Sequence, residues 1–449
     1  MAQILWLNWS GGGNLPPSLG IARVLTERGH HVAFAGRPEM VPRVKTAGFR
    51  AIEITKAYAQ VDRYPQGLPL TRPACYLTSP AVEEEVKSIV ASEAPDLILI
   101  DAMFPAALAH AGEFGRPSAV LVHTFVFRQL DMWRRVIGMF DGMRQQAGFG
   151  SLPPLEALWR PRERIISTSL AAFDGVPLAG WEMVRHAGPV LEDEKFVVPR
   201  ALPWPSVDPT PLVMVSFSTM FEQRNADKMQ RTLDGLADFQ VHVVATTAGI
   251  VAPSELAVPD NAVVLDYAAH DPIVKRAALV VTHGGHGTAM RALRHGVPMI
   301  LIPGLAGDQP FVAAAMQEFG AGLALPGDAG VEAIHEAAHR ILSTPSFKRN
   351  AHERAKALAG IDGAANAADE VESLLDPVPS RGAATAVRRL ICARQPHARR
   401  RGALPYFANN SSAAVMMPVS GCAAQYSPSF LALATNFSVS ITGGSSSPR

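Results

Sequence analysis

The stretch from Val280 to Ala315, VVTHGGHGTAMRALRHGVPMILIPGLAGDQPFVAAA, constrains the fold more than any other part of the chain. It begins with the end of an apolar β run, passes through a glycine-rich turn, His283–Thr288, and continues as a helix expected from about Ala289 to His295. Glycines let backbone N–H groups approach a ligand closely, and the first turn of a helix leaves unpaired donors at its positive end. Strand, glycine turn and helix in this order predict a phosphate-binding site.

The residues after this helix predict a second ligand-binding loop. The Gly296-Val297-Pro298 turn ends the helix, Met299–Ile302 has the composition of the next buried strand, and the loop that follows carries Asp308 and Gln309. Loops at the carboxyl ends of neighbouring parallel strands converge on one crevice. One loop therefore offers donors to a phosphate, and the next offers a carboxylate and a carboxamide suited to hydroxyl groups. This combination indicates a nucleotide sugar.

These residues resemble the signature of a known family, the inverting GT-B glycosyltransferases of the antibiotic, macrolide and UDP-glucuronosyl or UDP-glucosyl type. That signature reads roughly H-G-G-x-G-T, a helix, a G-V-P turn and then P…D-Q. The matching positions in this chain are His283, Gly284, Gly285, Gly287, Thr288, Gly296, Val297, Pro298, Pro303, Asp308 and Gln309. A match that keeps its order over roughly thirty residues is specific, unlike a lone glycine-rich loop.

The resemblance implies an α/β protein with the GT-B fold, in which two Rossmann-like doubly wound domains face a central cleft. It also implies a metal-independent, inverting hexosyl transfer from a UDP- or TDP-linked sugar, with the nucleotide sugar as co-substrate and no resident cofactor. The acceptor is expected to be a small hydrophobic molecule, aromatic or polyketide-like, such as a flavonoid or a macrolide.

The resemblance further assigns the donor contacts. His283, Gly285, Gly287 and Thr288 would contact the pyrophosphate, and Asp308 and Gln309 the sugar hydroxyls. Ser218 and Thr219, in a polar turn after the strand 212–216, would face the donor phosphates, although such a turn is equally expected as the lead-in to the next helix. The nucleotide base would meet the backbone at Ala268, where Ala268-Ala269 replaces the family's V-P motif.

The first half of the chain opens with a β-α-β unit. Gln3–Asn8 and His31–Ala35 have the composition of strands, and Ser18–Arg28 that of the helix between them. A dinucleotide-binding loop is the alternative. The loop sequence G-G-G-N-L-P, however, has Pro16 where the third glycine of G-x-G-x-x-G belongs, which argues against that alternative.

The catalytic residues are expected in the first half of the chain. The family's first loop reads G-H-x-x-P, with the His as general base, and Asn14 occupies that position here. A carboxamide can hold a hydroxyl but is not basic at neutral pH. Asp101 ends the strand Leu97–Ile100, where the family places the aspartate that partners the His. We therefore expect Asp101 to take the proton itself, directly or through water, if a partly dry cleft raises its pKa.

Each catalytic candidate has a structural alternative. Asp101 could instead cap a helix expected from about Pro105 to Phe114. His123, which follows the strand Pro117–Val122, is a second candidate base, but a lone His after a strand is often only a hydrogen-bonded structural residue. Four aromatic side chains are candidates for the acceptor site or for the core: Trp9, Phe104, Phe125 and Trp133.

A chain of 449 residues exceeds what one core usually organises, so two domains are expected. The predicted division is an acceptor domain (1–198), a Pro-rich linker (199–211), a donor domain (212–360), a helix returning to the first domain (361–376) and a tail (377–449). The tail has eight Arg and no Asp, Glu or Lys, which leaves 33 basic against 40 acidic residues before it, a net charge of −7. Such a tail is expected to be disordered or to result from an extended reading frame, with a basic membrane or nucleic-acid anchor as the alternative.

Composition limits the compartment and the partners. The three cysteines have neither disulfide nor zinc spacing, and the chain shows no signal-peptide pattern and no run of about 18 apolar residues. We expect a cytoplasmic protein, a monomer or weak homodimer without a metal, stable membrane insertion or a nucleic-acid partner. Its partners are expected to be a nucleotide sugar and a small-molecule acceptor. Two functional alternatives remain open at this point: a sugar-nucleotide epimerase on the same fold, and a non-catalytic auxiliary protein.

Overall fold

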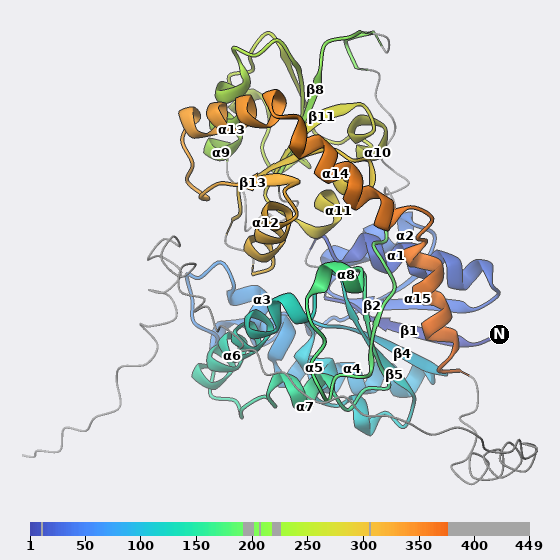
Figure 1. The fold of residues 1–449 in the computed structure, drawn as a ribbon. Helices are drawn as coiled ribbons and strands as arrows, with labels where there is room; N and C mark the ends of the chain where they lie inside the picture. The colour runs from blue at the N-terminus through green and yellow to red at the C-terminus, as the bar shows by residue number, and fades with distance from the viewer. Residues whose placement is uncertain (10–11, 192–201, 206–207, 218–225, 305–306, 376–449) are drawn as a thin grey trace, which may run out of the picture. The chain divides into compact units, whose positions relative to one another are not determined.

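The computed structural model describes residues 1–9, 12–191, 202–205, 208–217, 226–304 and 307–375. These residues lie in one compact unit, Met1–Leu375, which contains two separate β-sheets (Figure 1). All strand pairs in both sheets are parallel. Parallel sheets with helical crossovers are the doubly wound architecture that the sequence predicts.

The first sheet has seven strands in the order β3-β2-β1-β4-β5-β6-β7. Its strands are β1 (Gln3–Leu7), β2 (His31–Gly36), β3 (Arg50–Glu53), β4 (Leu97–Asp101), β5 (Ser118–Val122), β6 (Arg164–Ser167) and β7 (Val184–His186). The helices of this half are α1 (Leu15–Glu27), α2 (Val41–Thr46), α3 (Thr71–Thr78), α4 (Pro80–Glu93), α5 (Pro105–Leu108), α6 (Leu130–Gln146), α7 (Leu155–Trp159) and α8 (Ala171–Asp174). Short 3₁₀ turns lie at η1 (Pro38–Met40), η2 (Val61–Arg63), η3 (Ala111–Glu113) and η4 (Phe127–Gln129).

The second sheet has six strands in the order β10-β9-β8-β11-β12-β13. Its strands are β8 (Leu212–Ser216), β9 (His242–Thr246), β10 (Ala262–Leu265), β11 (Ala277–Thr282), β12 (Met299–Leu301) and β13 (Gly322–Ala324). The helices are α9 (Ala226–Leu236), α10 (His270–Val274), α11 (His286–Arg294), α12 (Gln309–Glu318), α13 (Val331–Ser343), α14 (Pro345–Leu358) and α15 (Gly363–Glu372), with a 3₁₀ turn at η6 (Pro253–Glu255).

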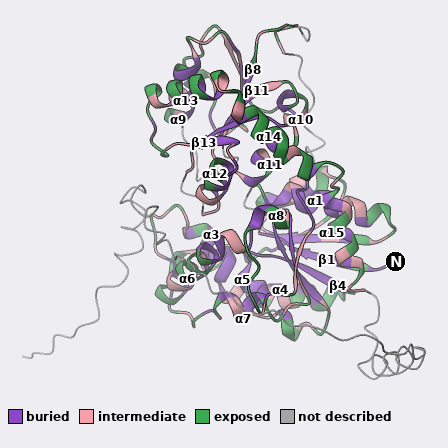
Figure 2. Cartoon of the chain, viewed as in Figure 1, coloured by how far each residue is buried: buried purple, intermediate pink, exposed green. Residues whose placement is uncertain are grey.

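Both sheets are buried on both faces, which explains why their strands are continuously apolar in sequence. Alternate residues of a strand point to opposite faces. In β4, Ile98 and Ile100 pack into one core cluster and Leu97 and Leu99 into another. The side chains of β8 and β11 alternate in the same way between two further core clusters. Figure 2 shows the buried strands beneath the more exposed helices that cover them.

The helix α15, late in the described chain, packs against α1 near its beginning (Figure 1). The side chain of Asp362 caps α15 by accepting hydrogen bonds from two backbone N–H groups of its first turn. Ion pairs then join the two helices, with Arg28 Nη1 2.7 Å from both Asp369 and Glu372. The division of the chain into two domains at a Pro-rich hinge stays a prediction.

Three helix boundaries differ from the sequence-based expectation. Helix α1 begins at Leu15 and not at Ser18, because Pro16 and Pro17 fit the first turn of a helix, where no N–H partner is needed. Helix α11 begins at His286, three residues before the expected start, so Gly287 lies inside its first turn. The expected helix 105–114 is a single turn, α5, followed by the 3₁₀ turn η3.

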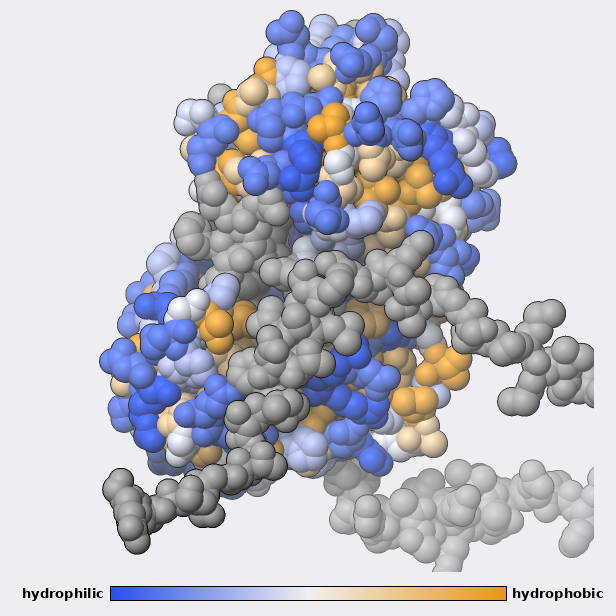
Figure 3. Space-filling view, turned by 90° about the vertical axis from the view of Figure 1, so that its left-hand side faces the viewer, coloured by the Kyte–Doolittle hydropathy of each residue, from blue (hydrophilic) through white to orange (hydrophobic). Residues whose placement is uncertain are grey.

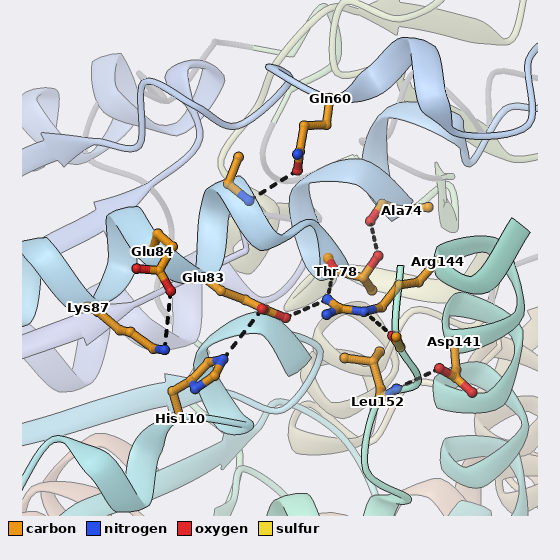
Figure 4. Close-up of polar contacts among 12 residues, drawn as sticks. Gln60, Ala74, Thr78, Glu83, Glu84, Lys87, His110, Asp141, Arg144 and Leu152 are labelled. Atoms are coloured by element: carbon orange, nitrogen blue, oxygen red, sulfur yellow. Dashed lines mark hydrogen bonds and ion pairs between the residues drawn. The ribbon is translucent and has the colours of Figure 1, made fainter. Parts of the chain in front are cut away.

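A buried ion-pair network fixes α4 against α6 in the first half (Figure 4). Arg144 Nη1 lies 2.5 Å from Glu83 Oε1, and both residues are only 8% exposed. Arg144 also donates to the carbonyl of Thr78 and, through Nε, to that of Gly150. His110 Nε2 lies 3.5 Å from the other oxygen of Glu83. The network lies away from the strand ends described below, and we interpret it as structural.

None of the described helices combines the length and the apolar character that crossing a bilayer requires. On the face drawn in Figure 3, hydrophilic and apolar residues are interspersed around the residues shown in grey. Large apolar side chains that are exposed among the described residues are few and scattered along the chain, such as Met139, Leu178 and Tyr267.

Candidate active site

Asn14 and Asp101 meet at the point where the first sheet reverses its strand order. The chain runs from β1 outward through β2 and β3, and returns to pair β4 with the other side of β1. Loops after two such neighbouring strands diverge and leave a crevice at their carboxyl ends. Asn14 follows β1 at the start of α1, and Asp101 is the last residue of β4. The topology therefore brings together two residues that lie 87 positions apart in sequence.

The two side chains are joined by a short hydrogen bond. Asn14 Nδ2 donates to Asp101 Oδ2 at 2.5 Å, and the other carboxylate oxygen accepts from the backbone N–H of Met103 at 2.9 Å. The opposite amide orientation would set a carbonyl oxygen against the carboxylate, so the donor assignment is firm. The carbonyl of Asn14 anchors the hydroxyl of Ser18 at 3.0 Å, and Ser18 in turn accepts from Asn8.

The side-chain oxygen of Asn14 is unpartnered within the part of the chain that the structure describes. Its side chain is 1% exposed, and Oδ1 makes no hydrogen bond to any described residue. A buried oxygen left without a donor costs free energy, which is recovered when a ligand supplies an O–H or N–H group. Asn14 thus faces Asp101 with its amide nitrogen, and its side-chain oxygen has unused hydrogen-bonding capacity.

Asp101 is completely buried, and its environment changes its acidity. Burial raises the pKa of this carboxyl to about 6, against the hydrogen bonds from Asn14 and Met103, which lower it. According to the sequence-based hypothesis, Asp101 accepts a proton from the acceptor, and a carboxylate can do this well only if its pKa is raised. The capping alternative is not supported, because α5 has Phe104 as its N-cap residue and no side-chain cap.

His123 and His286 are two further histidines near the site. His123 Nδ1 and His286 Nε2 are buried and lack hydrogen-bond partners among the described residues. Burial lowers the pKa of His123 to about 4 and that of His286 to about 3. At neutral pH both rings are therefore uncharged and weakly basic. The role of His123 as a base stays a prediction, and His286 was not singled out from the sequence because it occupies the variable position of the motif.

The glycine-rich turn directly follows β11. Strand β11 pairs with β8, and the second sheet reverses its strand order between these two strands. Two glycines of this turn lie in close contact with other residues. Gly284 has a φ of +88°, and a Cβ there would lie 2.9 Å from the carbonyl oxygen of Gln309. A Cβ on Gly285 would lie 2.7 Å from Nε2 of His283. The turn therefore packs closely against the Asp308-Gln309 segment, and the ring of His283 packs against Gly285.

Hydrogen bonds and burial fix the polar groups of this second site. The backbone of Ser216 holds the ring of His283, whose pKa burial lowers to about 4. Gln309 is 3% exposed, and its Oε1 accepts from the N–H of Gly304 at 2.6 Å. Burial raises the pKa of Asp308 to about 6. Gly287 is exposed and Thr288 is half-buried in the first turn of α11, so the amino end of this helix is accessible.

Lys228, at the start of α9, is a residue that the sequence analysis missed. It is 5% exposed, and its Nζ donates to the carbonyls of Ile302 at 3.0 Å and Pro303 at 3.2 Å, across the end of β12. Burial lowers its pKa to about 8. A buried cation beside His283 suits a ligand with two phosphates. The only sequence signal was its place at the start of the helix after the polar turn 217–219.

The remaining predicted donor residues are placed less fully. Ser218 and Thr219 lie outside the described residues. Ala268 is buried between β10 and α10, and the neighbouring His270 is hydrogen-bonded to Thr246. Contact of the nucleotide base with this backbone stays a prediction. No group of three or more His, Cys, Asp or Glu side chains that could hold a metal ion occurs within the described ranges.

The four aromatic acceptor candidates are buried. Trp9 lies under the guanidinium of Arg37, and Phe104 stacks on Tyr76 with ring centres 4.8 Å apart. Phe125 packs edge-to-face on His286 at 5.3 Å, and its carbonyl accepts the indole N–H of Trp133 at 3.1 Å. All four therefore have packing partners, and contact with an acceptor stays a prediction.

Comparisons of the sequence with known proteins agree with this geometry. Residues 230–374 match the model of the erythromycin biosynthesis protein CIII-like C-terminal domain. The demethyllactenocin mycarosyltransferase of Streptomyces fradiae is 25% identical over 415 residues, covering 84% of this chain and 87% of that protein. The NDP-glycosyltransferase YjiC of Bacillus licheniformis is 24% identical over 393 residues, covering 84% and 98%.

Solved structures show the same fold. The calicheamicin glycosyltransferase CalG4 superimposes with a TM-score of 0.65 at 23% identity, covering 84% of this chain and 99% of that one. The glycosyltransferase VinC, crystallised with dTDP, gives a TM-score of 0.62 at 19% identity, covering 83% and 99%. The fold is therefore GT-B, as the sequence predicts.

Fold, motif and relatives together define a class: this chain is a nucleotide-sugar glycosyltransferase. The resemblance found in the sequence is confirmed: over most of its length the chain is similar to macrolide and NDP-sugar glycosyltransferases, and its residues 230–374 match the erythromycin CIII-like C-terminal domain.

Proposed function

We propose that this enzyme transfers a hexosyl group, with inversion, from a UDP- or TDP-linked sugar to a small hydrophobic natural product, aromatic or polyketide-like. The observation that carries the proposal is the contact between the glycine turn and the Asp308-Gln309 loop at the switch point of the second sheet. There, the backbone of Gly284 lies so close to Gln309 that no side chain fits between them. Phosphate donors and hydroxyl-binding groups are thereby held side by side.

The donor diphosphate would lie at the amino end of α11. Helix donors and the buried ammonium of Lys228 would stabilise the charge that develops on the leaving diphosphate. Asp308 and Gln309 would hold the sugar hydroxyls, with His283, Gly285, Gly287 and Thr288 around the phosphates. These groups favour departure of the diphosphate without requiring a metal ion.

The acceptor would be held by the first sheet. Asn14 Oδ1 would accept a hydrogen bond from the O–H or N–H of the attacking group, and Asp101 would supply negative charge behind the amide. The sequence also suggested that Asp101 takes the proton directly. Such a transfer requires Asn14 to move away, because Asn14 Nδ2 lies 2.5 Å from Asp101 Oδ2. His123 remains an alternative base. Trp9, Phe104, Phe125 and Trp133 are the aromatic side chains from which an acceptor surface would be built.

Relatives support a natural-product acceptor. Their names describe the transfer of mycarose to demethyllactenocin and the glycosylation of oleandomycin. A test would incubate the purified chain with UDP-glucose, TDP-glucose or a TDP-deoxysugar and a panel of macrolides and flavonoids, and would follow product by mass spectrometry. A glycosylated acceptor with release of UDP or TDP is expected. Donor epimerisation without transfer would favour the epimerase alternative, and donor binding without any turnover would favour the auxiliary protein.

A further inference from the structure

The Asn14–Asp101 pair lacks a base that can reach the acceptor, and this restricts which atom can attack the sugar. Asp101 has no exposed surface, and both of its oxygens already accept hydrogen bonds, from Asn14 and from the backbone of Met103. Asn14 covers the Oδ2 side of the carboxylate with its amide nitrogen. Its amide cannot take up a proton at neutral pH.

Oxygen and nitrogen acceptors differ in their need for such a base. When an alcohol attacks the anomeric carbon, the product oxygen carries three bonds and is strongly acidic, so its proton has to leave as the bond forms. When a neutral amine attacks, the nitrogen becomes an ammonium, which is stable and loses its proton to water afterwards. A positioned general base typically contributes about 10²–10⁴-fold to a rate, and only the oxygen acceptor needs this contribution.

The charge of the pair points in the same direction. The carboxylate of Asp101, held 2.5 Å behind the Asn14 amide, favours a positive charge that develops on the attacking atom. It disfavours a phenol that arrives already ionised, because two negative charges would then face each other across one amide. The unpartnered Oδ1 of Asn14 can accept an N–H hydrogen while the nitrogen lone pair stays free to attack.

We propose that this enzyme is an N-glycosyltransferase whose preferred acceptors are uncharged aromatic amines, with Asn14 Oδ1 holding the amine N–H and Asp101 stabilising the ammonium that forms. This inference rests on the function proposed above and specifies the acceptor. The nitrogen lone pair forms the bond to the anomeric carbon, and the bond from that carbon to the phosphate oxygen breaks with its electron pair. The nucleoside diphosphate leaves, and the ammonium proton passes to water. Aliphatic amines are poor acceptors at neutral pH, because protonation occupies their lone pair.

The test compares two acceptors of the same shape, 4-butylaniline and 4-butylphenol, with whichever of UDP- or TDP-glucose the protein binds. For the unaltered chain we expect kcat/KM for the aniline to exceed that for the phenol by about 100-fold. Asn14→His places a basic ring beside Asp101 and removes the amide oxygen, so we expect it to raise kcat/KM for the phenol about 100-fold and, like Asn14→Ala, to raise KM for the aniline. Asn14→Ala removes the orphaned oxygen and is expected to raise KM for the aniline.

The outcomes separate this inference from the function on which it rests. Equal or preferred transfer to the phenol by the unaltered chain would overturn it, as would an Asn14→His variant with an unchanged phenol-to-aniline ratio. If the protein glycosylates neither compound but still binds UDP or TDP in calorimetry, the amine preference is refuted while the proposed donor site is not. Failure to bind either nucleotide would refute the proposed function itself. Nucleotide binding by each variant shows that it is folded.

Discussion

Replacing Gly284 by Ala tests whether close packing of the two donor loops is what builds the nucleotide site. The residue has a φ of +88°, a left-handed conformation that costs an L-residue roughly 1–2 kcal/mol. The new Cβ would also lie 2.9 Å from the carbonyl oxygen of Gln309. Because that atom belongs to the backbone, the loop has to shift, and such overpacking typically costs about 1–3 kcal/mol.

Together these two effects predict a loss of about 2–5 kcal/mol, divided between folding and ligand binding. If about 2 kcal/mol of this falls on binding, the affinity for UDP or TDP decreases roughly 30-fold, since 1.4 kcal/mol corresponds to a factor of ten. The remainder would lower the thermal unfolding midpoint. Titration calorimetry and differential scanning calorimetry on the same preparation measure both parts.

Gly330→Ala provides the matched control in the same half of the chain. Gly330 precedes α13 with a φ of −79°, and an added Cβ there meets no atom within 4 Å. Because Gly330 is the N-cap residue of α13, where Ala is less favourable than Gly, we expect an unchanged nucleotide affinity and a loss of stability of no more than about 1 kcal/mol. If Gly284→Ala were as harmless as this control in both measurements, the contact between the two loops would not be what holds the donor site together.

Four further predictions concern other residues. Asp101→Asn is expected to remove nearly all turnover while calorimetry shows unchanged nucleotide binding; full activity would move the catalytic charge to another group. Burial raises the pKa of Asp101 to about 6 in the folded state, so kcat/KM should rise as the pH rises through about 6. The contribution of Asp101 to stability changes in the opposite direction: it is fully present below the ordinary pKa of 3.8 and is lost as the pH rises through about 6. A pH–rate profile without this acid limb would contradict the assignment. Glu83→Gln leaves Arg144 buried without its anion and should destabilise the fold by about 3–5 kcal/mol in urea unfolding, whereas Glu84→Gln, an exposed neighbour, should leave the midpoint unchanged (Figure 4). Asp362→Ala removes the cap of α15 and should cost about 1 kcal/mol; no change in the unfolding midpoint would show that the cap is dispensable.

Local sequence determined the fold class and the elements that surround the proposed donor site. The stretch from Val280 to Ala315 is contiguous, so strand, glycine turn, helix and the Asp308-Gln309 loop could be predicted from periodicity and turn residues alone. Helices α13 and α14 are also encoded locally, since each keeps an amphipathic period over its whole length. The early start of α1 was missed, since two prolines look like a turn in sequence but also fit the first turn of a helix.

Tertiary structure alone decided how Asn14 and Asp101 are arranged. The sequence identified Asn14 and Asp101 separately, but not that the amide of Asn14 covers the carboxylate and leaves its own oxygen unpaired. Lys228 reaches the carbonyls of Ile302 and Pro303 only because α9 lies over the end of β12. Hydrogen-bond direction, burial and the resulting pKa depend on atoms that the fold brings together from distant positions, and no local pattern encodes them.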